Sequence, residues 1–454
     1  MTQTDANPSN PSGPPSGTPP SGGFMTALRE AWPLFVGIVL LMLGNGLQGT
    51  LLGVRATVEG FGATLTGAMT AMFYVGFLGG STWTARIVPT VGHIRVFAAL
   101  TSGASVTILV QGLVVDPYTW GLMRFLTGVC LAGIFVVAES WLNEKADNKT
   151  RGQMMGIYMV VTYVGMAGGQ ILFSISNPID VDPFIFISVL ISLAAIPMLL
   201  SASKAPELSN PSSVTMTRLY RVSPLGVVGT FVTGVVSGAL FGMGGVYAEL
   251  SGFDNAGIAA FMLAIMAGSV LLQWPIGRLS DLIDRRTVIT GTAIGAAATA
   301  LSITLLGATS WPVFLALVTL FGGLSLSLHP LAIAYTNDYL EPTELVGASS
   351  GLIVIMGLGM ILGPLITGVL FQGLGPGSYF WFCAVGNGLI ALFAIYRSTQ
   401  REAIPNEEQG TFVPLATTPT AITVEAVEEL HADGVERPSD DDDTEAVAEV
   451  HISD

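Results

Sequence analysis

Two charged side chains lie inside a long apolar run of this sequence, where a charge is costly and asks for a functional reason. Arg124 lies six residues past the start of the run 118–141, and Glu139 lies near its other end. Charges within a membrane-spanning helix are rare and commonly mark a substrate or proton pathway. In a helix the two residues would be separated by about 22 Å along the axis, so they cannot pair with each other. We therefore expect them to belong to different sites.

Further polar side chains in apolar runs could line a path for a polar solute. Asn45 and Gln48 share one helix face, and His329 precedes a proline that opens the helix. The candidates for substrate binding are Asn45, Gln48, Arg124, Gln170 and His329. The candidates for carrying a proton are Glu139 and His329, because a carboxyl group and an imidazole can each exchange a proton.

Each of the three ionisable candidates also has a structural interpretation. Arg124 could clamp the backbone of a neighbouring helix, and Glu139 could form an ion pair at its helix end with Arg86 or Arg151. His329 could be a neutral, hydrogen-bonded core residue. The sequence alone leaves these alternatives open.

One segment has the composition of a conformational latch. From Gly277 to Arg286 it reads GRLSDLIDRR, with an aspartate four residues after the glycine and two arginines at its end. Asp and Arg side chains at such a turn can pair with neighbouring helix ends and hold one of two states, or the bases can serve only to set topology. The gating candidates at the two membrane faces are Arg55, Tyr247, Glu249, Gly277, Asp281, Arg285, Arg286, Arg86 and Arg151.

The apolar character of the chain determines which elements must hold these residues. The 454 residues are 51% hydrophobic and 11% charged, whereas soluble domains carry about 25% charged residues. Because lipid offers no hydrogen-bond partner to open backbone, runs of the ~20 residues that span a bilayer should be helices. Twelve such runs are present: 32–54, 63–84, 94–115, 118–141, 153–175, 183–202, 224–247, 256–275, 287–307, 311–335, 347–370 and 377–397.

Basic residues and a repeat define the topology. Fourteen of the seventeen Lys and Arg residues fall on one side if both termini lie there, and the positive-inside rule makes that side the cytoplasm. The polar loop 203–223 separates two halves, 25–202 and 224–400, whose similar segments are offset by 192 to 194 residues. Two such six-helix halves place a substrate site at their interface.

The two ends of the chain differ from the rest. Residues 1–24 are rich in proline, glycine and serine and lack the basic residues of a signal peptide. Residues 401–454 form an acidic tail, with fifteen acidic residues and one basic residue from 402 onward. We expect both ends to be disordered.

The motifs resemble those of the major facilitator superfamily over about residues 25–400. The segment Gly277–Arg286 is similar to its loop signature, and Arg124 with Gly128 is similar to its arginine-xxx-glycine motif. GHIR (92–95), AESWLN (138–143) and RG (151–152) resemble the YcaD-like bacterial subgroup. The resemblance implies an all-α membrane protein with twelve transmembrane helices in two six-helix bundles and both termini cytoplasmic. It also implies a carrier in the bacterial inner membrane that works by rocker-switch alternating access.

We therefore predict a secondary active transporter for a small polar or anionic organic solute, monomeric in the lipid bilayer and coupled to protons. A proton-driven multidrug efflux antiporter is the main alternative, and a transporter-like membrane sensor is another. The sequence has no phosphate loop, metal-spaced His/Cys cluster or nucleophile triad, so we expect no enzyme activity, no cofactor and no metal. With the bases confined to short loops, we expect no nucleic-acid partner.

Overall fold

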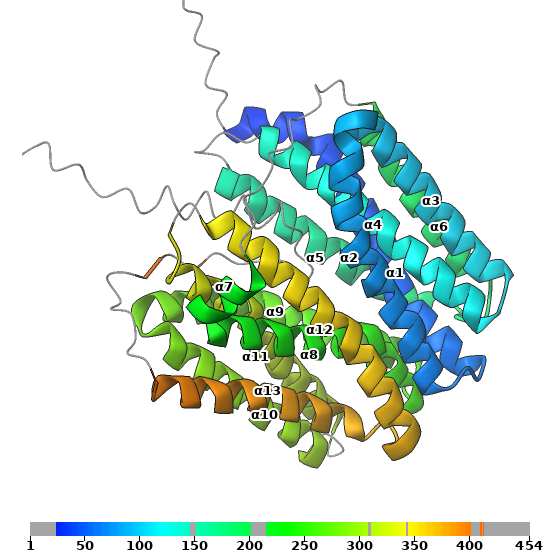
Figure 1. The fold of residues 1–454 in the computed structure, drawn as a ribbon. Coiled ribbons are helices and arrows are strands. Elements are labelled where there is room, and N and C mark those ends of the chain that lie inside the picture. The colour runs from blue at the N-terminus through cyan, green and yellow to red at the C-terminus, as the bar shows by residue number, and fades with distance from the viewer. Residues whose placement is uncertain are drawn as a thin grey trace, which may run out of the picture.

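The chain folds into two bundles of helices (Figure 1), described in a computed structural model for residues 24–145, 151–200, 215–306, 310–341, 344–400, 409–410 and 412. The first bundle contains α1 (Phe24–Val58), α2 (Ala63–Val91), α3 (His93–Leu113), α4 (Pro117–Lys145), α5 (Arg151–Ile175) and α6 (Asp182–Leu199). The second contains α8 (Pro224–Leu250), α9 (Asn255–Leu282), α10 (Arg285–Leu306), α11 (Trp311–Asn337), α12 (Leu345–Leu374) and α13 (Ser378–Ser398). The short helix α7 (Met216–Val222) precedes the second bundle.

Eleven of the described helices are long and apolar enough to cross a membrane. The expected span at 183–202 corresponds to α6, whose apolar stretch Asp182–Pro197 is shorter than the others. The all-helical membrane fold is therefore confirmed with eleven candidate spans, and the twelfth stays a prediction. Helix α7 lies in the segment 203–223, which we expected to be a loop. Residues 1–23, which make up nearly all of the expected N-terminal tail, lie outside the described residues.

Helices α2 and α4 pack backbone against backbone through glycines. A Cβ atom at Gly76 would overlap the carbonyl oxygen of Phe125, and one at Gly128 would overlap that of Phe73. Contacts this close between membrane helices require residues without a side chain. The glycines therefore fix how deeply α4, which carries Arg124 and Glu139, sits against α2.

The same contact recurs in the second bundle. A Cβ atom at Gly268 in α9 would overlap the carbonyl oxygen of Thr319 in α11. Gly268 lies 192 residues after Gly76, and Thr319 lies 194 after Phe125. This packing agrees with the sequence offset that relates the two halves.

The two bundles meet at the end where α1 and α8 finish and diverge toward the opposite end (Figure 1). At the meeting end, the Thr64 hydroxyl donates to the Gly368 carbonyl oxygen at 3.3 Å, and Asn255 Nδ2 donates to the Ser176 carbonyl oxygen at 2.9 Å. A Cβ atom at Gly53 would lie 3.0 Å from Val246, and one at Gly67 would overlap the Pro364 carbonyl oxygen. We call this set of contacts the seam.

Candidate functional site

Arg124 lies in α4 with its charged group held over an aromatic ring of α2. The guanidinium carbon is 4.4 Å from the centroid of the Phe73 ring, and the residue is 8% exposed. Stacking on the ring face offsets part of the cost of burying the charge. Among the described residues, no carboxylate pairs with Arg124, and no hydrogen bond ties it to a neighbouring backbone. The guanidinium therefore keeps its N–H donors for another partner.

The neighbourhood of Arg124 reaches the boundary between the bundles. Tyr74, next to Phe73 in α2, interacts electrostatically with Arg124 and forms a buried cluster with Met356 and Met360 of α12. A cation of the first bundle thus lies one layer of side chains from the second bundle. The repeat in the sequence predicts a substrate site at this interface.

We expect Gly128→Ala to disturb this arrangement, because the new methyl group would overlap the Phe73 carbonyl oxygen. Overpacking of this kind costs about 1–3 kcal/mol. Thermal unfolding in detergent should therefore show a lower Tm. Gly121→Ala is the matched control in the same helix, since its nearest neighbouring atom would be 4.0 Å away. A Gly128→Ala protein as stable as the Gly121→Ala protein would contradict this account of the motif.

Gln48 in α1 is a buried amide. It is 1% exposed, and neither its Oε1 nor its Nε2 has a hydrogen-bond partner among the described residues. Each unsatisfied buried polar group costs about 1–3 kcal/mol, so this side chain is suited to a bound polar molecule. Asn45, one turn earlier, is half-buried.

Gln170 has a different role from the one expected. Its Nε2 donates to the Gly46 carbonyl oxygen at 2.9 Å, and its Oε1 accepts from the Thr50 hydroxyl at 2.9 Å. These bonds tie α5 to α1, so the polar atoms of Gln170 are already used in helix packing. We leave it out of the proposed substrate site.

Glu139 is buried near the other end of α4. It is 2% exposed and accepts a hydrogen bond of 2.8 Å from the Tyr158 hydroxyl of α5. Of the two ion-pair partners expected for it, Arg86 is exposed, and the side chain of Arg151 lies outside the described part of the chain. Glu139 is thus a carboxyl group held between two helices of the first bundle.

His329 in α11 is 2% exposed, and neither of its ring nitrogens has a hydrogen-bond partner in the described part of the chain. The burial that the structural interpretation expected is present, whereas its hydrogen bond is not found among the described residues. Two buried threonine hydroxyls without a partner, those of Thr230 and Thr233, lie in α8, which packs on α11. The second bundle thus also carries polar atoms that no described residue satisfies.

Of the gating candidates Arg55, Tyr247 and Glu249, Arg55 pairs with neither of the other two in this conformation. Arg55 pairs with Glu59 at 2.7 Å, and it donates to the carbonyl oxygens of Pro178 and Ile179 between α5 and α6. The partners of Arg55 thus all belong to the first bundle. The carbonyl groups just before α6 lie close enough to accept from its guanidinium. Tyr247 instead stacks on Tyr379, with ring centroids 4.7 Å apart. Glycine and threonine contacts of the seam join the bundles here.

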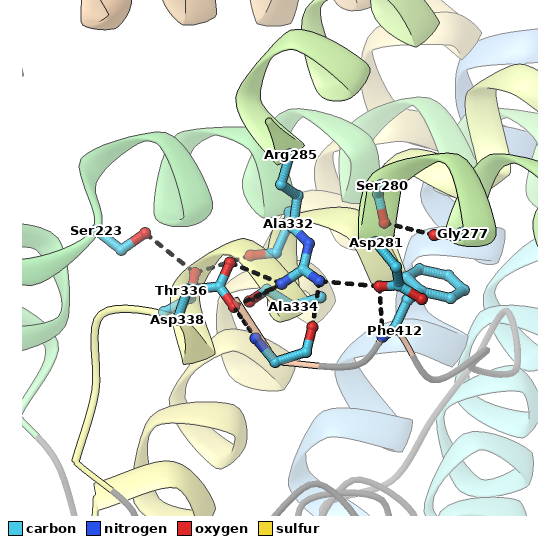
Figure 2. A network of polar contacts seen from close by, with 11 residues as sticks. Ser223, Gly277, Ser280, Asp281, Arg285, Ala332, Ala334, Thr336, Asp338 and Phe412 are labelled. Atoms are coloured by element: carbon cyan, nitrogen blue, oxygen red, sulfur yellow. Dashed lines mark hydrogen bonds and ion pairs between the residues drawn. The ribbon is translucent and has the colours of Figure 1, made fainter. Parts of the chain in front are cut away.

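The segment from Gly277 to Arg286 forms a buried ion network (Figure 2). Arg285, 1% exposed at its side chain, donates to Asp338 at 2.6 Å and to Asp281 at 3.2 Å. It also donates to the Ala334 carbonyl oxygen at 3.0 Å. The guanidinium therefore joins the end of α9, the start of α10 and the end of α11. We call Asp281, Arg285 and Asp338 the Arg285 network.

Asp338 and Arg286 add to this region. Burial raises the pKa of Asp338 above its usual range, against the opposing effect of the Arg285 charge. Arg286 is also buried and donates to the Arg397 carbonyl oxygen of α13 at 3.5 Å. The predicted pairing of latch residues with helix ends is thus present, and Asp338 is a member that the motif did not reveal.

Comparison with known proteins agrees with this architecture. The model of the Major Facilitator Superfamily matches residues 34–274 and 257–429, and the chain belongs to this family of transporters. The chain is 27% identical over 349 residues to the MFS-type transporter YcaD of Escherichia fergusonii, covering 76% of this chain and 89% of the relative. YcaD of Escherichia coli O139:H28 is likewise 27% identical, over 356 residues.

Solved structures share the fold. The nucleoside transporter NupG superposes with a TM-score of 0.68 at 13% identity, over 82% of this chain and 98% of that one. A bacterial homolog of the human lysosomal transporter Spinster, inward-facing and occupied, gives a TM-score of 0.64 at 15% identity, over 84% of this chain and 98% of that one. At these identities the likeness extends to the fold alone.

Proposed function

We propose that this protein is a secondary active transporter for a small organic solute carrying a negative charge, located in the bacterial inner membrane. The observation that carries the proposal is Arg124, a buried guanidinium without a carboxylate partner in the described chain, close to the boundary between the bundles. A buried charge is stable only when it is compensated. An anionic solute would supply that compensation, and Gln48 offers a second polar contact from α1.

Alternating access is the mechanism that best fits the arrangement of the bundles. With both termini in the cytoplasm, the seam lies on the outer side, and the bundles diverge toward the cytoplasm (Figure 1). This conformation would then be inward-facing. Rocking about the seam would close the cytoplasmic side and expose the region of Arg124 to the outside.

A ligand screen with the purified full-length protein tests the proposal. The probes are mono- and dicarboxylates, sugar phosphates and nucleoside monophosphates, each paired with its uncharged analogue. A ligand at 100 times its Kd stabilises the folded state by about 2.7 kcal/mol, so a true substrate should raise Tm by several degrees. Flux of the hit into proteoliposomes should then exceed flux into empty liposomes. A response to the uncharged analogues alone would contradict the anionic substrate class.

Proton coupling is proposed to run through Glu139, because it is a buried carboxyl group within a span. We expect an inward-directed proton gradient, with the outside more acidic, to drive accumulation of the screened substrate. Glu139→Gln should abolish that dependence on the gradient. Glu59→Gln is the matched control, since Glu59 pairs with Arg55 near the opposite end of the first bundle. Gradient-driven accumulation that is equal in wild type and Glu139→Gln would exclude this role.

A further inference from the structure

A short piece of the C-terminal tail is bound to the Arg285 network (Figure 2). The Gly410 N–H donates to Asp338 Oδ1 at 3.1 Å, and the Gly410 carbonyl oxygen accepts from Arg285 Nη2 at 2.6 Å. The Phe412 N–H donates to Asp281 Oδ1 at 2.9 Å. Backbone groups of the tail thus bond to all three charged side chains of the network.

The Phe412 side chain anchors this segment. It is 9% exposed and belongs to a buried cluster with Val288 and Tyr335, against which Ile276 also packs. Burial of a phenylalanine side chain contributes about 1.5–3 kcal/mol. The expectation of a disordered tail from residue 401 onward therefore does not hold for Gly410 and Phe412.

Gly277 is explained by this ring and not by its backbone. Its φ is not among the left-handed glycine angles of the described chain, and it lies inside α9, where glycine costs roughly 1 kcal/mol relative to alanine. A Cβ atom at Gly277 would overlap the ring of Phe412. The missing side chain leaves the space that the ring occupies.

The first bundle lacks this space. The packing offset of 192 residues between α2 and α9 places Ala85 at the position of Gly277. Ala85 is exposed and carries the methyl group that Gly277 lacks. The tail therefore has a docking place on the second bundle that the repeat does not reproduce on the first.

We propose that Gly277, Asp281, Arg285 and Asp338 form a docking surface for the chain's own residues Gly410 and Phe412, and that this docked part of the tail holds the bundles apart at this end. The surface surrounds the turn between α9 and α10, at the end where the bundles diverge. All described contacts of these tail residues are with the second bundle. In the proposed motion, closing this end brings that turn toward the first bundle, so the docked residues would have to leave first and their bonds would favour the open arrangement. The second half of the inference rests on the proposed alternating access, whereas the docking does not.

Hydrogen–deuterium exchange of the full-length protein tests the docking. The amides of Gly410 and Phe412 donate to carboxylates, so the tail peptide that contains them should exchange slowly. Gly277→Ala should expel the ring and speed exchange of that peptide about tenfold, while α9 stays protected. Gly291→Ala is the control, because a Cβ atom there would meet nothing within 4 Å. Equal exchange in wild type and Gly277→Ala would overturn the docking.

Distances between spin labels test the second half of the proposal without any substrate. Labels are placed at Val91→Cys and Ile283→Cys, exposed positions at the ends of α2 and α9, in a Cys130→Ala, Cys383→Ala background. With the tail docked, we expect a single long distance between the two labels. In Gly277→Ala and Phe412→Ala we expect a second population with a shorter distance between them. If variants whose tail amides exchange fast kept the wild-type distribution of label distances, the proposal that the docked tail holds the bundles apart would be wrong. This readout is independent of the substrate class proposed for Arg124.

Discussion

Replacing Arg285 with alanine is expected to destabilise the protein by about 3–5 kcal/mol. The substitution leaves the Asp338 carboxylate, 2% exposed at its side chain, without its cation, and the tail segment without its strongest donor. Removing one partner of a buried pair is costly because the remaining charge stays desolvated. Thermal unfolding of the purified protein should show a fall in Tm of about 3–5 °C.

Two comparisons make this result interpretable. The Arg218–Glu344 pair has a similar distance of 2.6 Å, but Arg218 is 56% exposed, so Arg218→Ala should cost at most about 1 kcal/mol. Combining Arg285→Met with Asp338→Leu removes both charges and should recover much of the lost stability. An Arg285→Ala protein no less stable than Arg218→Ala would show that the network contributes nothing to the fold.

The second large effect is expected at Arg124. Unlike Arg285→Ala, its replacement should not lower the stability of the protein. Arg124→Met should leave Tm unchanged or raise it, because no carboxylate among the described residues pairs with the buried charge and the Phe73 ring offsets only part of its cost. The same variant should lose the Tm response to the screened anion, since a charge-assisted contact contributes about 1.5–3 kcal/mol. The measurements are thermal unfolding with and without ligand, and flux into proteoliposomes.

Arg124→Lys separates charge from shape. Lysine keeps the cation but not the planar group that stacks on Phe73, so a partial ligand response is expected. If Arg124→Met lost stability and kept the ligand response, Arg124 would be a structural clamp and the proposed substrate site would be wrong. The two readouts thus distinguish the alternatives that the sequence leaves open.

The fold was largely predictable because apolar run length and glycine content are local properties of the sequence. Runs of spanning length predicted the long helices, and the offset of 192 to 194 residues reappears where Gly76 meets Phe125 and Gly268 meets Thr319. Helix α7 was missed because its seven residues, MTRLYRV, carry too few apolar positions to show a helical pattern. Its single buried residue, Leu219, is buried by tertiary packing.

The site was predictable in residue types but not in partners. Arg124, Gln48 and His329 were singled out as polar groups in apolar runs, and they are buried without a described hydrogen-bond partner. The same criterion selected Gln170, whose partners lie more than a hundred residues away in α1. Sequence spacing cannot distinguish these cases, because a side chain's partners depend on how the helices pack.

The contact that Phe412 makes was missed because the tail was judged by its average composition. The fifteen acidic residues from 402 onward predict a solvated segment throughout. One aromatic residue, Phe412, hardly changes that average. The available signal was a single aromatic residue after the last span, Phe412, two residues past a glycine. Such a residue has reason to be buried, because leaving it in water forgoes the free energy of apolar burial.

The position of the seam has a mechanical consequence. Its contacts include a glycine set against backbone, Gly67 against Pro364, and in the proposed alternating access they would serve as the pivot. From Pro364 to the first residue of α12, Leu345, the helix extends about 30 Å. A tilt of roughly 10° at the pivot moves that far end by about 5 Å, the width of a small solute. In the proposed alternating access, a small sliding motion at the seam would therefore be enough to open or close the opposite end of the two bundles.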